Sequence, residues 1–288
     1  MNTRTKGIIC IISAAFCFAL MGLFVRLSGD VPSMQKSFFR NFVALLVVAF
    51  IFIKNHEKIS VKKEDWKFLF ARAGFGTVGL ICNFYAIDHL VLSDASMLNK
   101  LSPFFAIIFS YIILKEKCTV VQAIAVIGAF IGALFIIKPT GNIANFPALI
   151  GALGGLGAGI AYTMVRILGK RGVKGNIVVL FFSAFSCLVC LPFMLADFRP
   201  MTFYQTMMLI LAGVSATGGQ FSITRAYMYA PAKEISVYDY SQIIFSALLG
   251  FIFLGELPDM FSVLGYIVIC SMAVWMYIYN KEKEKQAE

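Results

Sequence analysis

Long apolar stretches follow one another along the whole chain, separated by short polar connections. Ten of them reach about the 20 residues that a helix needs to cross a bilayer. The predicted spans are residues 7–28, 36–54, 67–87, 94–114, 119–138, 147–168, 176–196, 204–226, 233–254 and 261–280. The pattern predicts an all-α membrane protein of ten transmembrane helices, without room for a soluble domain.

Two of these spans are related in sequence. Residues 94–116, DASMLNKLSPFFAIIFSYIILKE, match residues 234–256, EISVYDYSQIIFSALLGFIFLGE, without gaps at an offset of 140 and with five identities. Apolar segments resemble one another by composition, but here the polar positions keep register as well, so that Asn99 falls on Asp239. A duplicated membrane unit is typical of transporters whose binding site lies between the two halves.

The loop at residues 138–147 divides the predicted spans five and five. Because each unit then has an odd number of spans, the second copy enters the membrane from the opposite side. We therefore expect an inverted repeat, with the first five-helix unit in residues 1–140 and the second in residues 141–288.

Composition and charge agree with a multi-pass membrane protein. The chain is 60% hydrophobic and 14% charged, whereas a soluble domain has about 25% charged residues. Its net charge is +10, and of the 25 Lys and Arg residues 17 fall on one side of the membrane, five on the other and three within spans. This positive-inside distribution predicts that both termini are cytoplasmic and that the chain lies in the plasma membrane. It explains the basic charge by the lipid bilayer and not by nucleic acid.

Residue types that usually form catalytic and metal sites are scattered. Cys187 and Cys190 form a C-x-x-C, but inside an apolar stretch without His or acid nearby, and His56 and His89 lie in loops on opposite faces. We therefore predict no catalytic group, no metal and no cofactor. An intramembrane lipid-headgroup enzyme, the alternative from another class, would need clustered acids or a nucleophile–base pair at one membrane depth.

Glycines recur every fourth residue in the fifth and sixth spans, which lets helix backbones approach closely in lipid. They are Gly128 and Gly132 in the fifth span, and Gly151, Gly155 and Gly159 in the sixth. Residues 74–79 of the third span spell G-x-G-x-x-G, which binds a dinucleotide only between a strand and a helix. Within a transmembrane stretch, these glycines are expected to pack helices or to line a cavity.

Each of the two related spans carries one stripe of small and polar residues at helical spacing. The stripes are Ser96, Asn99, Pro103, Ala106 and Ser110, and Ser236, Asp239, Ile243, Ser246 and Gly250. Tight packing also selects small residues, but Asn99 and Asp239 favour a cavity. Pro103 is expected to kink its helix beside them.

Lys100 and Asp239 are charged residues deep within these spans. Each charge at a helix centre costs about 2.5–3.5 kcal/mol, so the two side chains should pair, face water or bind substrate. They would neutralise each other in the empty protein and separate when a zwitterion supplies both charges. A permanent structural ion pair and snorkelling to the interface are the alternatives. Asp239 could also carry a coupling proton, as buried acids do in other transporters.

Further polar residues complete the candidate site. Arg72 and Arg225 lie toward the cytoplasmic ends of their spans, where snorkelling competes with a place in the interior. In the interior they would form a cationic vestibule for carboxylates, as could Arg40 near the outer end of the second span. The predicted substrate-binding residues are Asn99, Lys100, Asp239, Arg72, Asn83, Tyr238 and Gln242.

The paired segments also carry a family resemblance. NKLSPFFAIIFSYIILKE and SQIIFSALLGFIFLGE, together with FALMGLFVRLSG and FFRNFVALL, resemble the EamA-type ten-span members of the drug/metabolite transporter superfamily. The resemblance covers nearly the whole chain. It implies alternating access around a central cavity lined by the first four spans of each half, with the fifth and tenth spans peripheral. Ile243 stands where the first copy has Pro103, so kinking is expected to be asymmetric.

The sequence therefore predicts a secondary transporter for a small metabolite, and not an enzyme. Cationic side chains outnumber acids within the spans, which favours an amino acid or a related zwitterionic or carboxylate compound. The alternative is an exporter of aromatic or cationic compounds, drugs included. For such cargo Asp239 and the tyrosines would serve as counter-ion and stacking surface.

Overall fold

The computed structural model describes residues 3–56, 60–114, 119–137, 146–229 and 237–285, and within these ranges the chain folds into helices and contains no strand. A single 3-10 turn, η1 (Lys63–Asp65), precedes the third helix. The α-helices are α1 (Thr3–Leu27), α2 (Ser33–Lys54), α3 (Trp66–His89), α4 (Leu92–Asn99), α5 (Ser102–Leu114), α6 (Val120–Ile137), α7 (Phe146–Lys170), α8 (Gly175–Ala196), α9 (Phe203–Tyr229), α11 (Ser241–Leu254) and α12 (Met260–Lys285).

In the described ranges, nine helical stretches are long and apolar enough to cross a membrane. Helices α4 and α5 together form one of them, and α6 adds a shorter apolar stretch, Ala123–Ile137. The chain is therefore a helical, multi-pass membrane protein. Ten spans and cytoplasmic termini stay predictions, and the predicted boundary between the repeats at residue 140 lies outside the described residues.

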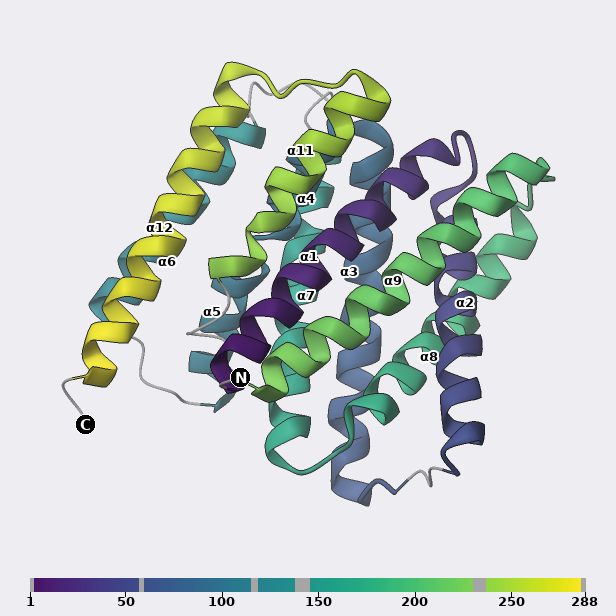
Figure 1. Cartoon of the computed structure of the whole chain (residues 1–288), viewed down its shortest axis with the longest axis horizontal. Coiled ribbons are helices and arrows are strands. Elements are labelled where there is room, and N and C mark those ends of the chain that lie inside the picture. The colour runs from purple at the N-terminus through teal and green to yellow at the C-terminus, as the bar shows by residue number, and fades with distance from the viewer. Residues whose placement is uncertain (1–2, 57–59, 115–118, 138–145, 230–236, 286–288) are drawn as a thin grey trace.

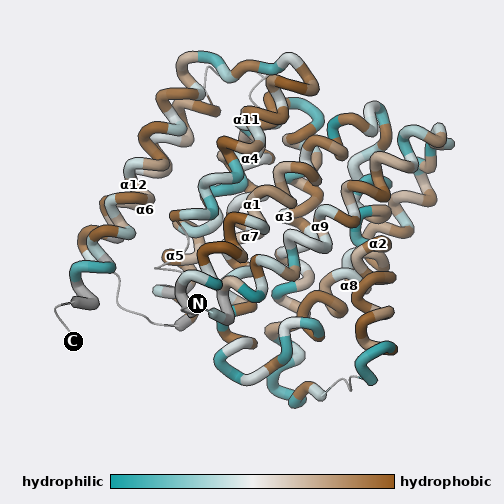
Figure 2. Tube along the Cα trace, viewed as in Figure 1, coloured by the Kyte–Doolittle hydropathy of each residue, from teal (hydrophilic) through white to brown (hydrophobic). Residues whose placement is uncertain are grey.

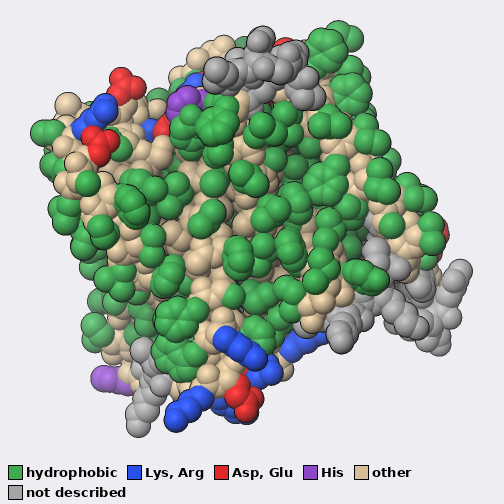
Figure 3. Space-filling model, turned by 180° about the vertical axis from the view of Figure 1, so that it is seen from behind, with side chains coloured by type: hydrophobic (Ala, Val, Ile, Leu, Met, Phe, Trp, Pro, Cys, Tyr) green, Lys and Arg blue, Asp and Glu red, His purple; other side chains and the backbone are tan. Residues whose placement is uncertain are grey.

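The outer surface of the bundle is apolar along its middle and charged at its ends. Figure 3 shows hydrophobic side chains covering most of one face, with Lys, Arg, Asp, Glu and His gathered at the upper and lower edges. Along the trace, hydrophilic positions concentrate toward helix ends and loops (Figure 2). Phe50, Leu188 and Ile244 are among the large apolar side chains on this surface, each at least 65% exposed. An apolar surface of this extent requires lipid around it.

Helices from the two parts of the chain pack against each other in pairs. Helix α1 lies along α9, α3 along α7 and α2 along α8 (Figure 1). Helices α6 and α12 pair with each other at one side of the molecule, and their inner faces share a buried apolar cluster with α4 and α5. They correspond to the fifth and tenth predicted spans, which the family resemblance implies are peripheral.

Glycines form the seams between these helices, as their spacing predicts. A Cβ added to Gly155 in α7 would lie 2.6 Å from the carbonyl oxygen of Leu98, and one on Gly159 would lie 2.8 Å from that of Ser102. In the α6–α12 pair, a Cβ on Gly265 would lie 2.7 Å from the carbonyl oxygen of Gly132. Such contacts between backbones are possible only without a side chain.

The G-x-G-x-x-G sequence lies within α3, so it has no strand before it. Gly79 faces α7, where an added Cβ would come within 3.0 Å of the Gly154 carbonyl oxygen, whereas Gly74 faces open space. Gly76 makes room for a neighbouring side chain, that of Arg72. The glycines thus serve packing and side-chain placement, as the sequence predicts.

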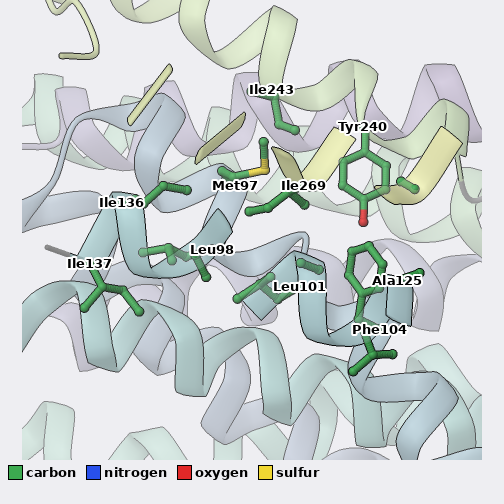
Figure 4. Close-up of a cluster of buried hydrophobic side chains, with 14 of the residues drawn as sticks. Met97, Leu98, Leu101, Phe104, Ala125, Ile136, Ile137, Tyr240, Ile243 and Ile269 are labelled. Atoms are coloured by element: carbon green, nitrogen blue, oxygen red, sulfur yellow. The ribbon is translucent and has the colours of Figure 1, made fainter. Parts of the chain in front are cut away.

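The largest buried apolar cluster surrounds α4 and the start of α5. Figure 4 shows Leu98, Leu101 and Phe104 meeting Tyr240 and Ile269 from the end of the chain. The rings of Phe104 and Tyr240 pack edge to face with their centres 6.4 Å apart. This cluster fixes the centre of α4–α5 against the C-terminal helices.

The fourth predicted span is interrupted by a short turn. Helix α4 ends at Asn99 and α5 begins at Ser102, with Lys100 and Leu101 in the turn between them. Pro103 therefore lies in the first turn of α5, where a missing backbone N–H leaves no hydrogen bond unmade. The interruption thus lies just before Pro103, beside Asn99 and Lys100, where the sequence predicts a kink.

The second copy breaks at the corresponding place. Residues 237–239 are helical, Tyr240 forms a turn and α11 begins at Ser241, and Tyr240 is the residue aligned with Lys100. This interruption occurs although Ile243 replaces the proline, and the expected asymmetry of kinking stays a prediction. Lys100 (φ −75°, ψ 5°) and Tyr240 (φ −67°, ψ −13°) keep backbone angles close to helical ones, so each interruption is one irregular turn that does not require proline.

Candidate functional site

The two helix breaks meet inside the bundle. Lys100 and Tyr240, the turn residues of the two breaks, are both buried. The hydroxyl of Tyr240 donates a hydrogen bond to the backbone carbonyl oxygen of Lys100 over 3.1 Å. That carbonyl is one of the acceptors that the end of α4 leaves without a helical partner. The aligned positions of the two copies are therefore in direct contact.

An ion pair joins the same two breaks. The Nζ of Lys100 lies 2.6 Å from Oδ2 of Asp239, and the two side chains are only 4% and 2% exposed. We call these two residues the central pair. The other carboxylate oxygen of Asp239, Oδ1, has no hydrogen-bond partner in the described part of the chain. The central pair thus keeps one unused acceptor in a buried place.

The polar stripes of the two related spans pack against each other beside the central pair. The Ser96 and Ser246 hydroxyl oxygens are 2.8 Å apart and share a hydrogen bond, and both side chains are buried. A Cβ on Gly250 would be in ordinary contact with Leu92 of α4, at 3.6 Å. At this level the stripes join helices closely, as the packing interpretation predicts.

The breaks place the other predicted residues of these two segments near the central pair along the chain. Asn99 is the half-buried last residue of α4, and Gln242 is buried in the first turn of α11. Tyr238 is half-buried and packs edge to face on Tyr277 of α12, with ring centres 6.1 Å apart. Asn83 lies elsewhere, half-buried on α3, with its backbone against Gly154 of α7.

Arg72 lies in the interior of the protein. Its side chain is 3% exposed, and its guanidinium carbon lies 4.2 Å from the ring centre of Phe182 on α8. Snorkelling to the interface is therefore excluded for Arg72, whereas Arg225 is exposed. Periodicity could not separate these two arginines, because both lie near the same end of their spans.

Sequence reasoning named Arg40 as a possible vestibule residue but did not include it among the predicted substrate-binding residues. It is as buried as Arg72, and its guanidinium carbon lies 5.7 Å from the centre of the same Phe182 ring. The signal was present in the sequence, since Arg40 is the fifth residue of the second predicted span, and an arginine within an apolar span is costly unless it has a role. We call Arg40 and Arg72 the arginine pair.

Two acids at helix ends have structural partners. Glu256 lies 2.7 Å from Arg26 and accepts the backbone N–H of Leu92 over 2.9 Å, which caps the start of α4. Asp94, one turn further along α4, accepts hydrogen bonds from the hydroxyls of Ser262 and Tyr266 on α12. Glu256 thus marks a helix end, as predicted, and its counterpart Glu116 lies outside the described residues.

Tyr162 of α7 interacts with both charged pairs. It is close enough to Asp239, Arg72 and Arg40 to interact electrostatically with all three. The charges of Arg40 and Arg72 also act on each other. The central pair and the arginine pair therefore belong to one electrostatically connected interior, formed by α2, α3, α4, α7, α8 and the segment before α11.

Comparisons with known proteins agree on one family. The EamA-like transporter family matches residues 5–138 and again residues 149–278. The pseudopaline exporter CntI of Pseudomonas aeruginosa is 31% identical over 272 residues, covering 93% of this chain and 95% of that protein. The riboflavin transporter of Vibrio cholerae is 23% identical over 98% of this chain and 96% of its own length. Mouse solute carrier family 35 member G1 is 25% identical over 91% of this chain and 76% of its own length.

A solved crystal structure has the same fold. It superposes on 98% of this chain and 99% of its own chain with a TM-score of 0.68, at 16% sequence identity. At that identity the likeness concerns the fold alone.

Proposed function

Since this chain belongs to the EamA-like transporter family, we propose that it is a secondary-active transporter of a small zwitterionic or carboxylate-bearing metabolite that works by alternating access. That it is a multi-pass membrane transporter, and not an enzyme, follows from the family and from its named relatives. Our proposal adds the substrate class and the mechanism. It also includes two inverted five-helix repeats, residues 1–140 and 141–288, with both termini in the cytoplasm.

The observation that supports the proposal best is the central pair at the facing helix breaks. Interrupted helices near the membrane centre are where many transporters bind substrate, because they free backbone groups for it. Here the two breaks occupy aligned positions and are joined by the 2.6 Å contact of Lys100 with Asp239. A buried ion pair is rarely selected for stability alone, since the cost of removing both charges from water is comparable to their attraction.

A zwitterion offers the same two charges as the central pair. Its ammonium group can replace Lys100 at Asp239, and its carboxylate can replace Asp239 at Lys100. Separating the pair without such a substrate leaves two buried charges unpaired, which is strongly unfavourable. A ligand shifts a conformational equilibrium only through its differential affinity for the two states. The substrate would supply this difference in affinity, because it can neutralise both charges after they separate. The helices that carry Lys100 and Asp239 would then move apart only when substrate is bound.

The test is counterflow in proteoliposomes that contain the purified protein. We expect labelled zwitterionic amino acids to exchange, and their amides and N-acetyl derivatives, which each lack one charge, to exchange at least about tenfold more slowly, since one charge-assisted contact is lost. Protein-free liposomes are the control. Exchange of the amide and N-acetyl forms at the rate of the parent amino acids would contradict the zwitterion proposal.

One observation favours a second candidate, an exporter of aromatic or cationic compounds. The unused Oδ1 of Asp239 could accept a cation while Lys100 stays bound to Oδ2. Competition distinguishes the two candidates. Aromatic ammonium compounds without a carboxylate should inhibit amino-acid counterflow only if this second candidate is correct.

Asp239 is also the residue that we propose to carry a coupling proton. We expect an imposed pH gradient to accelerate transport by the unaltered protein, and the residual flux of Asp239→Asn to be insensitive to the gradient. Asp239→Glu, which keeps a titratable carboxyl, should retain the acceleration. Proteoliposome flux measured with and without a gradient checks this. The same response to the gradient in Asp239→Asn as in the unaltered protein would show that the proton binds elsewhere.

A further inference from the structure

The arginine pair is an unusual feature of the membrane interior. Arg40 on α2 and Arg72 on α3 are each 3% exposed, and both guanidinium groups lie beside the ring of Phe182 on α8. Neither arginine forms an ion pair with any residue of the described ranges. Two like charges that are buried together without an acid are costly. The aromatic ring offsets part of this cost, but it neutralises no charge.

Buried hydrogen-bond donors on the helices that carry the arginine pair and Phe182 are left unused. The Nε atoms of both arginines have no hydrogen-bond partner in the described part of the chain. The same holds for the hydroxyl groups of Ser37, Thr77 and Ser183, all of them buried. Buried polar groups are nearly always hydrogen-bonded in folded proteins. Unused donors therefore occur on α2, α3 and α8, the same three helices that bring the two guanidinium groups together at Phe182.

Neighbouring residues shape this place. Asn41 accepts a hydrogen bond from Nη1 of Arg40 over 2.5 Å, and its own amide donates to the Ser186 hydroxyl over 2.7 Å, which fixes the Arg40 side chain against α8. Gly76 makes room for the other guanidinium, because a Cβ at this position would lie 2.2 Å from Nη1 of Arg72. Both arginines are thus held in place by groups that carry no negative charge.

We propose that Arg40 and Arg72, assisted by the unused hydroxyl groups on the same three helices, bind the carboxylate groups of the transported substrate, and that this substrate carries two of them. The inference rests on the proposed function and narrows its substrate class. The planar guanidinium group matches the two oxygens of a carboxylate, so each arginine can take one carboxylate. The central pair is neutral by itself, and the arginine pair carries two positive charges, which a substrate of two carboxylates neutralises. Tyr162 interacts electrostatically with both pairs, so both pairs belong to the same interior.

The test is ligand binding by the full-length protein purified in detergent. The probes are L-glutamate and succinate, the matched amides L-glutamine and succinamide, and inorganic phosphate. A ligand that binds only the folded state raises its melting temperature by mass action. We expect the two diacids to raise the melting temperature, L-glutamine to raise it less because it engages the central pair alone, and succinamide and phosphate to leave it unchanged. Equal shifts with the amides, or a shift with phosphate alone, would overturn the carboxylate assignment.

Variants locate the binding. Arg40→Met and Arg72→Met should each weaken diacid binding about ten- to hundredfold, the range for loss of a hydrogen bond to a charged group. Arg225→Met, at an exposed arginine, is the matched control and should bind normally. Without ligand, both interior variants should melt at or above the temperature of the unaltered protein, because an uncompensated buried charge is gone. Binding that persists in both interior variants would overturn the proposal.

A second pair of variants tests the position of the Arg72 guanidinium group without removing a charge. Gly76→Ala would displace the Arg72 guanidinium, whereas Gly74→Ala, two residues away in the same helix, meets nothing within 4 Å. Diacid binding should therefore weaken in the first variant and stay normal in the second. Two results together would overturn this inference but not the proposed function. They are amino-acid counterflow that depends on the central pair, and diacid binding that is unchanged in both arginine variants. Absence of any solute flux would instead remove the proposed function.

Discussion

Replacing Lys100 by methionine is expected to abolish transport and to destabilise the folded protein by about 3–5 kcal/mol, the usual cost of removing one partner of a buried ion pair. Asp239 would then lie 2% exposed without a counter-ion, and one of its oxygens already has no hydrogen-bond partner in the described ranges. The measurement is the unfolding midpoint in a denaturing detergent, together with counterflow in proteoliposomes. Lys174→Met, at an exposed lysine, should change neither quantity.

The double variant Lys100→Met, Asp239→Leu separates structure from function. Apolar side chains of similar volume in place of a buried ion pair are often neutral or stabilising, so its unfolding midpoint should return to that of the unaltered protein or exceed it. Transport should still be absent, because no charge is left to exchange with a zwitterion. If this double variant transports normally, the central pair is only a structural ion pair, the alternative that the sequence left open.

Hydropathy alone predicted most of the helical arrangement, because lipid requires long apolar helices and leaves few other ways to satisfy the backbone. Glycine spacing also predicted which faces come together, as Gly155 and Gly159 show at their contacts with α4 and α5. The break at Lys100 and Tyr240 was not predicted. It depends on tertiary contacts, among them the hydrogen bond from the Tyr240 hydroxyl, and a hydropathy window averages over such a turn.

The candidate site was predictable only where the two sequence copies could be compared. The ungapped alignment of the two copies places Asn99 on Asp239, next to Lys100, and so marks these positions as a candidate site. In the structure Lys100 and Asp239 are in contact. For the arginines no such comparison existed. The rotation of α2 and α3 about their own axes decides whether Arg40 and Arg72 face lipid, water or Phe182, and that rotation is set by the neighbouring helices.

The two charged pairs differ in what they require of a substrate. The central pair satisfies its own charges in the empty protein, so a substrate must displace an existing interaction to bind there. The arginine pair has unsatisfied charge and unused donors, so a substrate gains interactions without breaking an ion pair. The arginine pair is therefore suited to capture, and the central pair to coupling of binding with movement. Electrostatic contact through Tyr162 allows one substrate to reach both.

Replacing Gly157 by alanine is expected to destabilise the protein by about 1–3 kcal/mol, the usual cost of overfilling a tightly packed contact. A Cβ at this position in α7 would lie 2.8 Å from the carbonyl oxygen of Phe75 and 3.0 Å from the backbone of Gly79, both on α3. Backbone atoms cannot rotate aside as a side chain can, so the two helices must move apart. Because α3 carries Arg72 and α7 carries Tyr162, the shift should also slow counterflow.

The matched control for this seam is Gly169→Ala, near the end of the same helix, where an added Cβ meets nothing within 4 Å. Alanine is favoured over glycine in a helix by about 1 kcal/mol, so this variant should be as stable as the unaltered protein or more so. Unfolding midpoints of both variants in a denaturing detergent check the prediction. Equal midpoints for the two would mean that α3 and α7 are not held at this distance, and that Arg72 is not positioned by the seam.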